Sequence, residues 1–500
     1  MSQEIDAQAE LILAAEDCAP ELFDEMHTFS TLNDRRVLLT LVAHGPVLLR
    51  GGRGTGKSAF MIAASRQLYP AIPQAAALGV YMSLRHAPLL KSTGEAYERI
   101  LAQIVIRKVQ ETLGDLANDF DPHPDAGSVQ VALSRLAATL GKRIVLFFDD
   151  AAHLGREASL EEFFDIYRML SSSVVSCKAA IYPGVTRFGT RFDVYNDATV
   201  IDLLRSDEFP GFREIFLEVM EGRYFDAFGE DVFRSSLSRG GAAGFLGQSV
   251  LGNMRGFVFA CNALKAACAD GRNIGLPELG ESLIQLARNY YWPLLDEIQP
   301  KLGKYEPMVA VARQIAELLF EECGQKARNP RDMLIHREVD ERLAKPLQIL
   351  EYAGFISKRE ASRAMKSGGR GARYALNLCV LLEQTPGSRL TKELFERWTM
   401  HPREEAVQFN KTSKLAAIQL PALPESAELA IFNEPIDKLG KSAAYPYGLT
   451  AQKLQVLTEA GIRTVGDLAE TDDKTLDALP KIGRAMVTRI RNVLGQAIWM

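Results

Sequence analysis

The residues 46–58, PVLLRGGRGTGKS, contain the pattern that decides the fold. Within them, Gly51-Gly52-Arg53-Gly54-Thr55-Gly56-Lys57-Ser58 fits the phosphate-binding loop G-x-x-x-x-G-K-[ST]. A short apolar run, Val47-Leu48-Leu49, precedes this loop, as a buried parallel strand would, and SAFMIAASRQL follows it with apolar residues at helical spacing. The order strand, glycine loop and helix predicts an α/β fold that binds nucleotide phosphates at a helix N-terminus.

Each residue type in this loop has an expected task. Glycines leave room for backbone N–H groups to face the phosphates. Lys57 is expected to reach the β- and γ-phosphates, and Ser58 to hold Mg²⁺. ATP and Mg²⁺ are therefore the predicted cofactors. A chance glycine loop is the alternative, and the flanking strand and helix argue against it.

A second motif lies at residues 143–150, RIVLFFDD, where an apolar run ends in two carboxylates. This is the Walker B pattern, in which a buried strand delivers an acid to the metal at its C-terminal end. Asp149 is expected to orient Mg²⁺, and Asp150 to polarise the attacking water as the catalytic base. Because Asp is one methylene shorter than Glu, we expect slow hydrolysis. The alternative is a solvated pair of acids that closes the strand.

Composition limits the remaining choices. The chain has 500 residues, which predicts three or four domains, and its 47% hydrophobic and 24% charged content is ordinary for a soluble protein. The net charge of −5 means that nucleic-acid binding would need local basic patches. No run reaches 18 uncharged apolar residues, and the acidic N-terminus has no basic leader, so we expect a cytoplasmic protein without a membrane span. Six scattered cysteines without a C-x-x-C pair predict reduced thiols and no zinc site.

The order of patterns divides the chain into five predicted regions. Strands alternating with helices favour a parallel sheet covered by helices, so the expected fold class is an α/β P-loop NTPase core with smaller domains attached. The predicted regions are 1–225, N-terminal helices and the ATPase core; 226–300, a helical lid; 301–385, a winged helix; 386–446, an irregular linker; and 447–500, an all-α helix-hairpin-helix.

The turn Gly252-Asn253-Met254-Arg255-Gly256 precedes an apolar helix, FVFACNALKAAC. Together with the two motifs above, it makes the chain resemble the AAA+ ATPases of the origin-recognition initiator type and the related STAND switch ATPases, over roughly residues 20 to 385. The resemblance implies a lid whose Arg255 points back to the γ-phosphate. Met254 stands where Pro is usual in these families.

Two further elements of the site are expected near the predicted strand 178–183. That strand should adjoin the Walker B strand and runs into Thr186 and Arg187, either of which is a candidate sensor of the γ-phosphate; a plain surface arginine is the alternative. ATPases of this kind complete their site with an arginine from a neighbour. The resemblance thus implies a homo-oligomer or a partner subunit, with Arg191 and Arg205 as the candidates.

The predicted wing is basic. Two expected strands, 355–359 and 372–376, flank a glycine-rich loop, and six basic residues oppose Glu360 alone. Such a loop suits contacts with DNA phosphates. A winged helix that only packs on the ATPase is the alternative. The expected DNA-binding residues here are Lys358, Arg359, Arg370 and Arg373.

The last domain resembles the helix-hairpin-helix fold of the C-terminal domain of the RNA polymerase α subunit. LTAQKLQVLTEAGIRTVGDL (449–468) predicts two helices, and LPKIGR (479–484) opens the last one. Lys481, Gly483 and Arg484 are expected to contact DNA phosphates. Gln452 and Gln455 stand where that domain carries Arg and Asn, so sequence-selective reading is not expected. A protein-docking hairpin is the alternative.

These patterns predict a slow ATPase, forming ADP and phosphate, whose nucleotide state gates duplex DNA binding or assembly. A STAND-type signalling switch stays open as an alternative, with anti-phage defence as one role; it would bind an effector protein and oligomerise. A transcription regulator with an ATP-gated winged helix is a third interpretation.

Overall fold

The computed structural model describes residues 15–499, apart from residues 86, 152–156, 185–187, 190, 225–226, 269–270, 327–329, 401–405, 425–428 and 442–447. None of the helices in those residues is long and apolar enough to cross a membrane.

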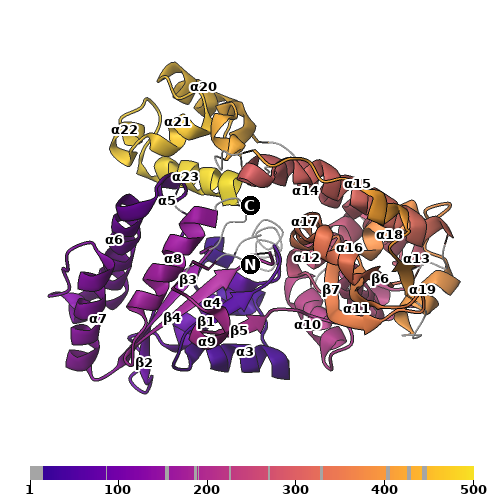
Figure 1. The fold of residues 1–500 in the computed structure, drawn as a ribbon, viewed down its shortest axis with the longest axis horizontal. Coiled ribbons are helices and arrows are strands. Elements are labelled where there is room, and N and C mark those ends of the chain that lie inside the picture. Colours follow the sequence, from indigo (N-terminus) through magenta and orange to yellow (C-terminus); the bar gives the residue numbers. More distant parts are fainter. Residues whose placement is uncertain are drawn as a thin grey trace.

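A five-stranded parallel sheet forms the centre of the N-terminal part (Figure 1). Its strands lie in the order β2-β3-β4-β1-β5. Because β4 lies between β1 and β3, one strand separates the two motif-bearing strands, and their carboxyl ends meet at the same edge of the sheet. This topology confirms the expected α/β P-loop NTPase core. The strands are β1 (Val47–Arg50), β2 (Ala77–Ser83), β3 (Arg143–Asp149), β4 (Val175–Ile181) and β5 (Thr199–Asp202).

Helices cover both faces of this sheet. Successive side chains of β1 point to opposite faces: Leu48 packs in the cluster with α6, α7 and α8, whereas Leu49 packs in the cluster with α3 and α4. The helices of this part are α2 (Phe23–Met26), α3 (Leu32–Val42), α4 (Lys57–Gln67), α5 (Ala87–Lys91), α6 (Gly94–Leu113), α7 (Ala126–Leu140), α8 (Glu157–Leu170), α9 (Val194–Asp197) and α10 (Phe212–Tyr224).

Helices follow the core in the region predicted as a lid. Its buried residues continue the apolar cluster of the sheet and pass without a break into the next domain. The lid therefore shares one core with the ATPase on one side and with residues beyond 308 on the other. Its helices are α11 (Arg239–Ser249), α12 (Met254–Ala267), α13 (Leu276–Leu286) and α14 (Trp292–Ile298).

The next elements lie in the region predicted as a winged helix. Helix α15 (Met308–Glu321) leads to β6 (Asp332–His336), then to α16 (Arg337–Arg342) and α17 (Ala344–Ala353). The antiparallel strands β7 (Ile356–Ala364) and β8 (Arg370–Leu376) complete the domain, and α18 (Leu378–Gln384) follows. Strand β7 extends five residues beyond the predicted strand, so the connecting loop is shorter than expected.

The expected irregular linker is more ordered than the prediction. It contains α19 (Lys392–Thr399) and β9 (Val407–Phe409), and β9 pairs in parallel with β6. The apolar side chains of Leu394, Trp398 and Phe409 are buried in the main core. This part of the chain thus packs as a component of the winged-helix region.

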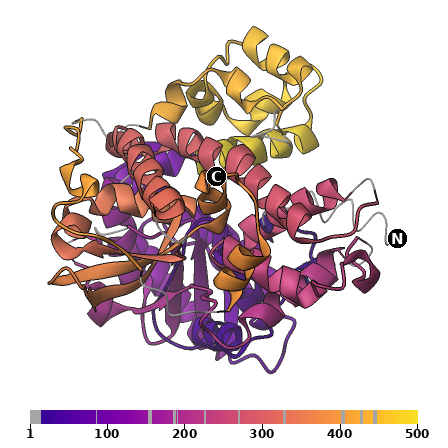
Figure 2. The same ribbon diagram turned by 90° about the vertical axis from the view of Figure 1, so that its right-hand side faces the viewer.

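The C-terminal domain consists of α20 (Ala451–Glu459), α21 (Val465–Glu470), α22 (Asp473–Asp477) and α23 (Arg484–Trp499). The two predicted helices of residues 449–468 are present as α20 and α21. The domain has a hydrophobic cluster of its own, to which Leu90 of α5 also belongs. Two views at right angles show it lying on top of the molecule, above both the core and the lid (Figures 1 and 2).

Candidate nucleotide site

The phosphate-binding loop is packed against the lid. Gly54 and Gly56 have φ angles of +80° and +94°, in the left-handed region that favours glycine. A Cβ atom at Gly54 would lie 2.6 Å from the Cβ of Arg255 and from Oδ1 of Asn253. The backbone N–H of Arg255 donates to the carbonyl of Gly54 at 3.2 Å. The lid turn predicted to sense the γ-phosphate therefore touches the loop that would bind it.

Lys57 lies at the start of α4, behind the loop. Its ammonium donates to the carbonyls of Gly51 and Gly52 at 2.9 and 3.0 Å, and it lies 4.0 Å from the centre of the Tyr182 ring. Burial lowers the pKa of Lys57 to about 8, although the nearby carboxylates oppose this shift. The lysine is thus held inside the cavity by groups that a phosphate would replace.

The carboxylate of Asp149 is fully buried at the end of β3. It accepts a hydrogen bond from the Tyr81 hydroxyl at 2.8 Å and contacts the hydroxyl of Ser58. Burial, and then the charges of Asp150 and Glu16, raise its pKa to about 8. Oxygens of Glu16, Asp149 and Asp150 lie within 4.8 Å of one another. A hydroxyl and clustered carboxylates are the hard oxygen ligands that Mg²⁺ prefers, so these residues fit that ion.

Asp150 adopts a left-handed backbone conformation, with φ of +52°. Its carboxylate contacts two neighbours. Oδ2 accepts from Nε of Arg85 at 2.7 Å, and Oδ1 accepts from the Tyr182 hydroxyl at 3.2 Å. Both oxygens of the predicted catalytic base are therefore engaged by protein groups.

These groups line a cavity of about 130 Å³ between the loop, the N-terminal segment and the lid. Two nitrogens of Arg53, Nε and Nη1, are buried there and have no hydrogen-bond partner within the described residues. A cavity with an apolar wall and a cationic wall fits a nucleotide, whose base is flat and whose phosphates are anionic. Its apolar wall includes Met26, Phe29, Val219, Met254 and Val258, and its cations are Arg53, Lys57, Arg85, Arg205, Arg223 and Arg255.

The structure brings most predicted site residues together. Residues 51–58, Asp149, Asp150 and Arg255 converge at one edge of the sheet, whereas Thr186 and Arg187 lie outside the described residues. Arg205 corrects an expectation. It lines this cavity and donates to the carbonyl of Thr55 at 2.6 Å, so it binds the phosphate loop of its own chain. It is therefore not placed to complete the nucleotide site of a neighbouring copy.

Sequence reasoning missed Arg85, Tyr182 and Glu16. Arg85 lies two residues after β2, and Tyr182 directly follows β4. Both are at the same edge as the Walker motifs, and this position could have indicated them. No sequence signal marks Glu16, which comes from the N-terminal segment and lies 3.5 Å from Arg85. His27, from the same segment, also lines the cavity.

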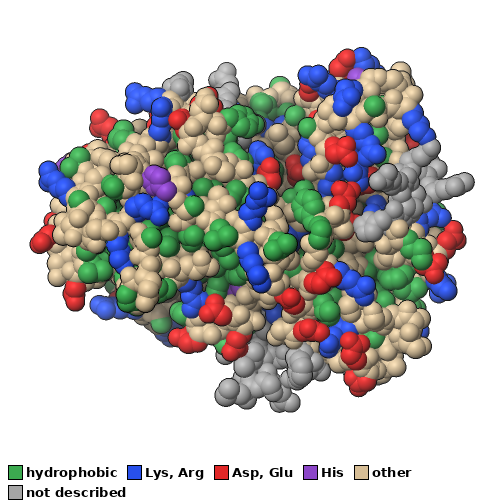
Figure 3. Space-filling model, turned by 90° about the horizontal axis from the view of Figure 1, so that it is seen from below, with side chains coloured by type: hydrophobic (Ala, Val, Ile, Leu, Met, Phe, Trp, Pro, Cys, Tyr) green, Lys and Arg blue, Asp and Glu red, His purple; other side chains and the backbone are tan. Residues whose placement is uncertain are grey.

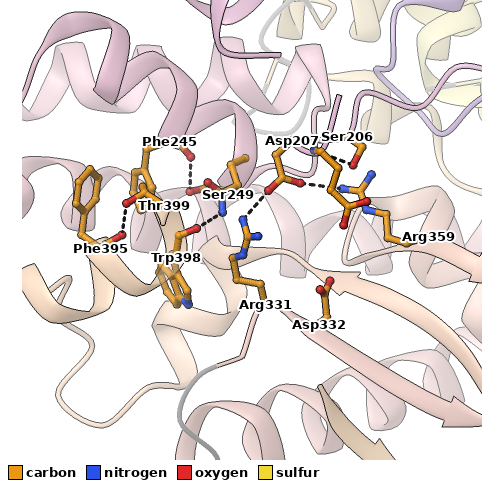
Figure 4. Close-up of polar contacts among 12 residues, drawn as sticks. Ser206, Asp207, Phe245, Ser249, Arg331, Asp332, Arg359, Phe395, Trp398 and Thr399 are labelled. Atoms are coloured by element: carbon orange, nitrogen blue, oxygen red, sulfur yellow. Dashed lines mark hydrogen bonds and ion pairs between the residues drawn. The ribbon is translucent and has the colours of Figure 1, made fainter. Parts of the chain in front are cut away.

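Two arginines of the predicted basic wing are paired with acidic residues, whereas the prediction had them contact DNA. Only 6% of the Arg359 side chain is exposed, and it lies 4.0 Å from the carboxylate of Asp207, which also pairs with Arg331 at 2.5 Å (Figure 4). Arg373 pairs with Glu208 at 2.7 Å. These cations therefore join the winged helix to the acidic segment after β5. The correction has a physical reason, since burying an arginine requires an acid beside it.

The other two wing residues differ from each other. Lys358 pairs with Asp340 at 2.9 Å, whereas Arg370 is exposed and donates to the hydroxyl of Ser362 at 2.6 Å. The space-filling view from below shows Lys and Arg side chains intermixed with Asp and Glu (Figure 3). Of the four wing residues expected to contact DNA, Arg370 is the one whose exposed charge has no acid beside it among the described residues.

The predicted hairpin residues are accessible. Lys481, Gly483 and Arg484 are all exposed and lie immediately before and at the start of α23. Within the part of the chain that the structure describes, no atom lies within 4 Å of the position of a Cβ at Gly483, so a phosphate could approach the backbone there. The first-turn N–H groups of a helix have no intrahelical partner and suit an anion.

Comparisons with known proteins give likeness of fold only. No protein-family model and no curated protein matches the chain. The chain is similar to the Orc1 protein of Aeropyrum pernix in complex with DNA, at 14% identity and a TM-score of 0.34, covering 75% of this chain and 95% of that one. It is also similar to Cdc6p from Pyrobaculum aerophilum, at 12% identity and a TM-score of 0.33, covering 75% and 99%.

A third similar structure is the Pyrococcus horikoshii STAND protein with a tetratricopeptide repeat sensor. Its identity is 12% and its TM-score 0.30, with 75% of this chain and 46% of that chain covered. Likeness at these identities and TM-scores carries no functional argument. The function must therefore be argued from the site.

Proposed function

We propose that the chain is an AAA+ ATPase that binds and hydrolyses ATP and whose nucleotide state gates duplex DNA binding by its C-terminal part. One observation carries the ATPase half of this proposal. A glycine loop with a buried lysine, a serine–aspartate pair and a second aspartate meet in a cavity lined by cations. This combination of groups suits the binding and hydrolysis of a nucleoside triphosphate.

The residues would divide the work as follows. Lys57, Arg53 and Arg255 would hold the phosphates, and Ser58 and Asp149 would hold Mg²⁺. Mg²⁺, when bound, neutralises charge on the phosphate oxygens. Asp150 would take the proton of the attacking water at its carboxylate once that carboxylate leaves its present partners.

Coupling between nucleotide and domains is supported by bonds of the loop itself. The side chain of Asn253 in the lid donates to the carbonyl of Arg53 at 2.5 Å. The backbone N–H of Arg53 donates in turn to the carbonyl of Tyr352 in α17, at 3.4 Å. A phosphate that reshapes the loop would therefore shift both the lid and the winged helix.

We assign the DNA contacts to the hairpin rather than to the wing. The exposed Lys481, Gly483 and Arg484 support this assignment, because they place cations beside free helix N–H groups. Exposed Arg370 adds one contact from the wing. Arg191, which is also exposed, is our candidate for completing the site of a neighbouring copy.

A second candidate function is the signalling switch. The observation that favours it is the set of ion pairs between winged helix and core, Arg331 and Arg359 with Asp207, which leaves the wing few free charges. In this alternative a protein ligand, and not DNA, binds the C-terminal part.

Two measurements test the proposal. Lys57→Ala should abolish ATP binding, measured by fluorescent-nucleotide titration, because the ammonium supplies a buried charge to the phosphates. Wild-type affinity in this variant would refute the nucleotide site. Steady-state ATP hydrolysis should rise when duplex DNA is added; hydrolysis indifferent to DNA would favour the switch.

A further inference from the structure

Helix α5 lies between the catalytic site and the C-terminal domain. It has five residues and begins two positions after Arg85. Its neighbouring leucines pack into different cores: Leu89 into that of the ATPase, and Leu90 into that of the C-terminal domain. Both side chains are 3% exposed. A displacement of the C-terminal domain should therefore move the segment that carries Arg85.

Polar contacts fix the same junction. The ammonium of Lys91 lies 2.7 Å from the carboxylate of Glu470 in α21 and 3.5 Å from the carbonyl of Gly466. It also lies 4.7 Å from the centre of the Phe432 ring. The last residue of α5 thus binds three groups of the C-terminal domain.

At the other end of this segment, Arg85 binds the carboxylate of Asp150, the predicted base. Its Nε holds one oxygen of Asp150 while the Tyr182 hydroxyl holds the other. The Asp150 side chain is 4% exposed and that of Arg85 is 18% exposed. Each carboxylate oxygen keeps a further acceptor site, but the bonds to Arg85 and Tyr182 fix the orientation of this buried side chain. Arg85 must therefore move before Asp150 can turn toward a water molecule and accept its proton.

The C-terminal domain also contacts the opposite wall of the cavity. The turn η9 (Ala430–Asn433), whose Ile431 belongs to the hydrophobic cluster of this domain, packs against η5 (Gln299–Lys301) beyond the lid. Lys301 pairs with Glu297 at 3.1 Å, and Glu297 with Arg53 of the phosphate loop at 3.4 Å. The domain therefore bridges the two walls of the nucleotide cavity, and each contact is linked to an arginine that lines it.

We propose that the docked C-terminal domain is a brake on ATP hydrolysis: by fixing α5 it keeps Arg85 on Asp150, and undocking frees this carboxylate. The brake rests on the proposed ATPase function and deepens it. The brake itself makes or breaks no covalent bond. Undocking separates the ion pair between Arg85 and Asp150, and the Asp150 carboxylate can then act as the base.

The first test reverses the charge at the junction. Glu470→Lys places a like charge opposite Lys91 and should raise kcat about two- to fivefold, the effect of losing one exposed ion pair. Glu459→Lys is the matched control, since it makes the same change on an exposed residue of the same domain away from α5. The double exchange Lys91→Glu with Glu470→Lys should restore the slow rate.

Two further variants separate docking from chemistry. Leu90→Ala should undock the domain more completely and raise kcat by tenfold or more, on the order expected for truncating a buried leucine. Arg85→Gln should reach the undocked rate and make kcat insensitive to Glu470→Lys. Hydrogen exchange of residues 87–91 and 465–470 measures undocking independently of turnover.

Several results would overturn the brake. One is an unchanged kcat in variants whose hydrogen exchange shows undocking. A second is unchanged hydrogen exchange in both Leu90→Ala and Glu470→Lys. A third is a kcat below that of the wild type in Arg85→Gln. The proposed function fails separately. If wild type and Lys57→Ala bind ATP equally, the proposed nucleotide site is refuted. If ATP binding depends on Lys57 but kcat is unchanged in Glu470→Lys and Leu90→Ala, only the brake is refuted.

Discussion

Replacing Asp207 by Asn should release the winged helix from the core. The Asp207 carboxylate pairs with Arg331 at 2.5 Å and lies 4.0 Å from Arg359. The exposed fractions of these side chains are 14% for the acid and 17% and 6% for the two arginines. Removing the charge leaves two guanidinium groups close together in a poorly solvated space.

The magnitude follows from this burial. Breaking a fully buried ion pair costs about 3 to 5 kcal/mol. These groups keep some solvent, and Asp332 also attracts Arg359, so we expect a loss of about 2 to 3 kcal/mol in the free energy of unfolding. The control is Glu341→Gln, because the partner pair Arg337–Glu341 is 75% and 59% exposed and should contribute little to the free energy of unfolding.

Urea unfolding followed by tryptophan fluorescence measures the difference. Trp398 is fully buried in the same region, and its carbonyl accepts from the Gln248 side chain of the lid at 2.6 Å. Its emission should therefore report separation of the domains. A loss of stability in Asp207→Asn no larger than that of the control would refute the reasoning that this carboxylate is the required counter-charge.

Three further predictions concern the site and the hairpin. Asp150→Asn should keep ATP affinity but lower kcat by roughly 10² or more, because the amide cannot accept the proton of the water; normal turnover would assign the base to another residue. Burial lowers the pKa of His27 from 6.5 to about 4, so the unfolded state binds more protons between these values and the free energy of unfolding falls, by up to about 3 kcal/mol, as the pH drops from 6.5 to 4. His27→Gln should flatten this part of the pH profile, and an unchanged profile would contradict the shift. Charge reversal at Lys481 and Arg484 should weaken DNA binding and reduce its salt slope by about 2; an identical slope would assign the hairpin to protein contacts.

The parts of the site that sequence reasoning predicted are those whose partners are close in the chain. All eight residues of the phosphate loop are consecutive, and Asp149 and Asp150 end a single strand. Their geometry depends on local backbone and on the sheet edge, both of which the apolar pattern indicates. Predicting Arg85 and Tyr182 would also have required the order of the strands in the sheet, and predicting Glu16 would have required the fold of the N-terminal segment.

The assignment of Arg359 and Arg373 to DNA failed for the opposite reason, because their acidic partners are distant in the chain. Counting the charges of residues 357–373 gives a basic loop, but Asp207 and Glu208, which pair with Arg359 and Arg373, come from the segment after β5. A local count cannot include acids that only the tertiary fold brings near. Strand β9 was missed similarly, since three residues gain strand geometry only by pairing with β6.

The close packing at Gly54 has an evolutionary consequence. A Cβ at this position would clash at 2.6 Å with both Asn253 and Arg255, and the left-handed φ adds strain for any other residue. The loop and the lid turn therefore form one inherited unit, although the chain positions are far apart. Homologues that lose the glycine should also have altered positions 253 and 255, so substitutions at these three sites should covary.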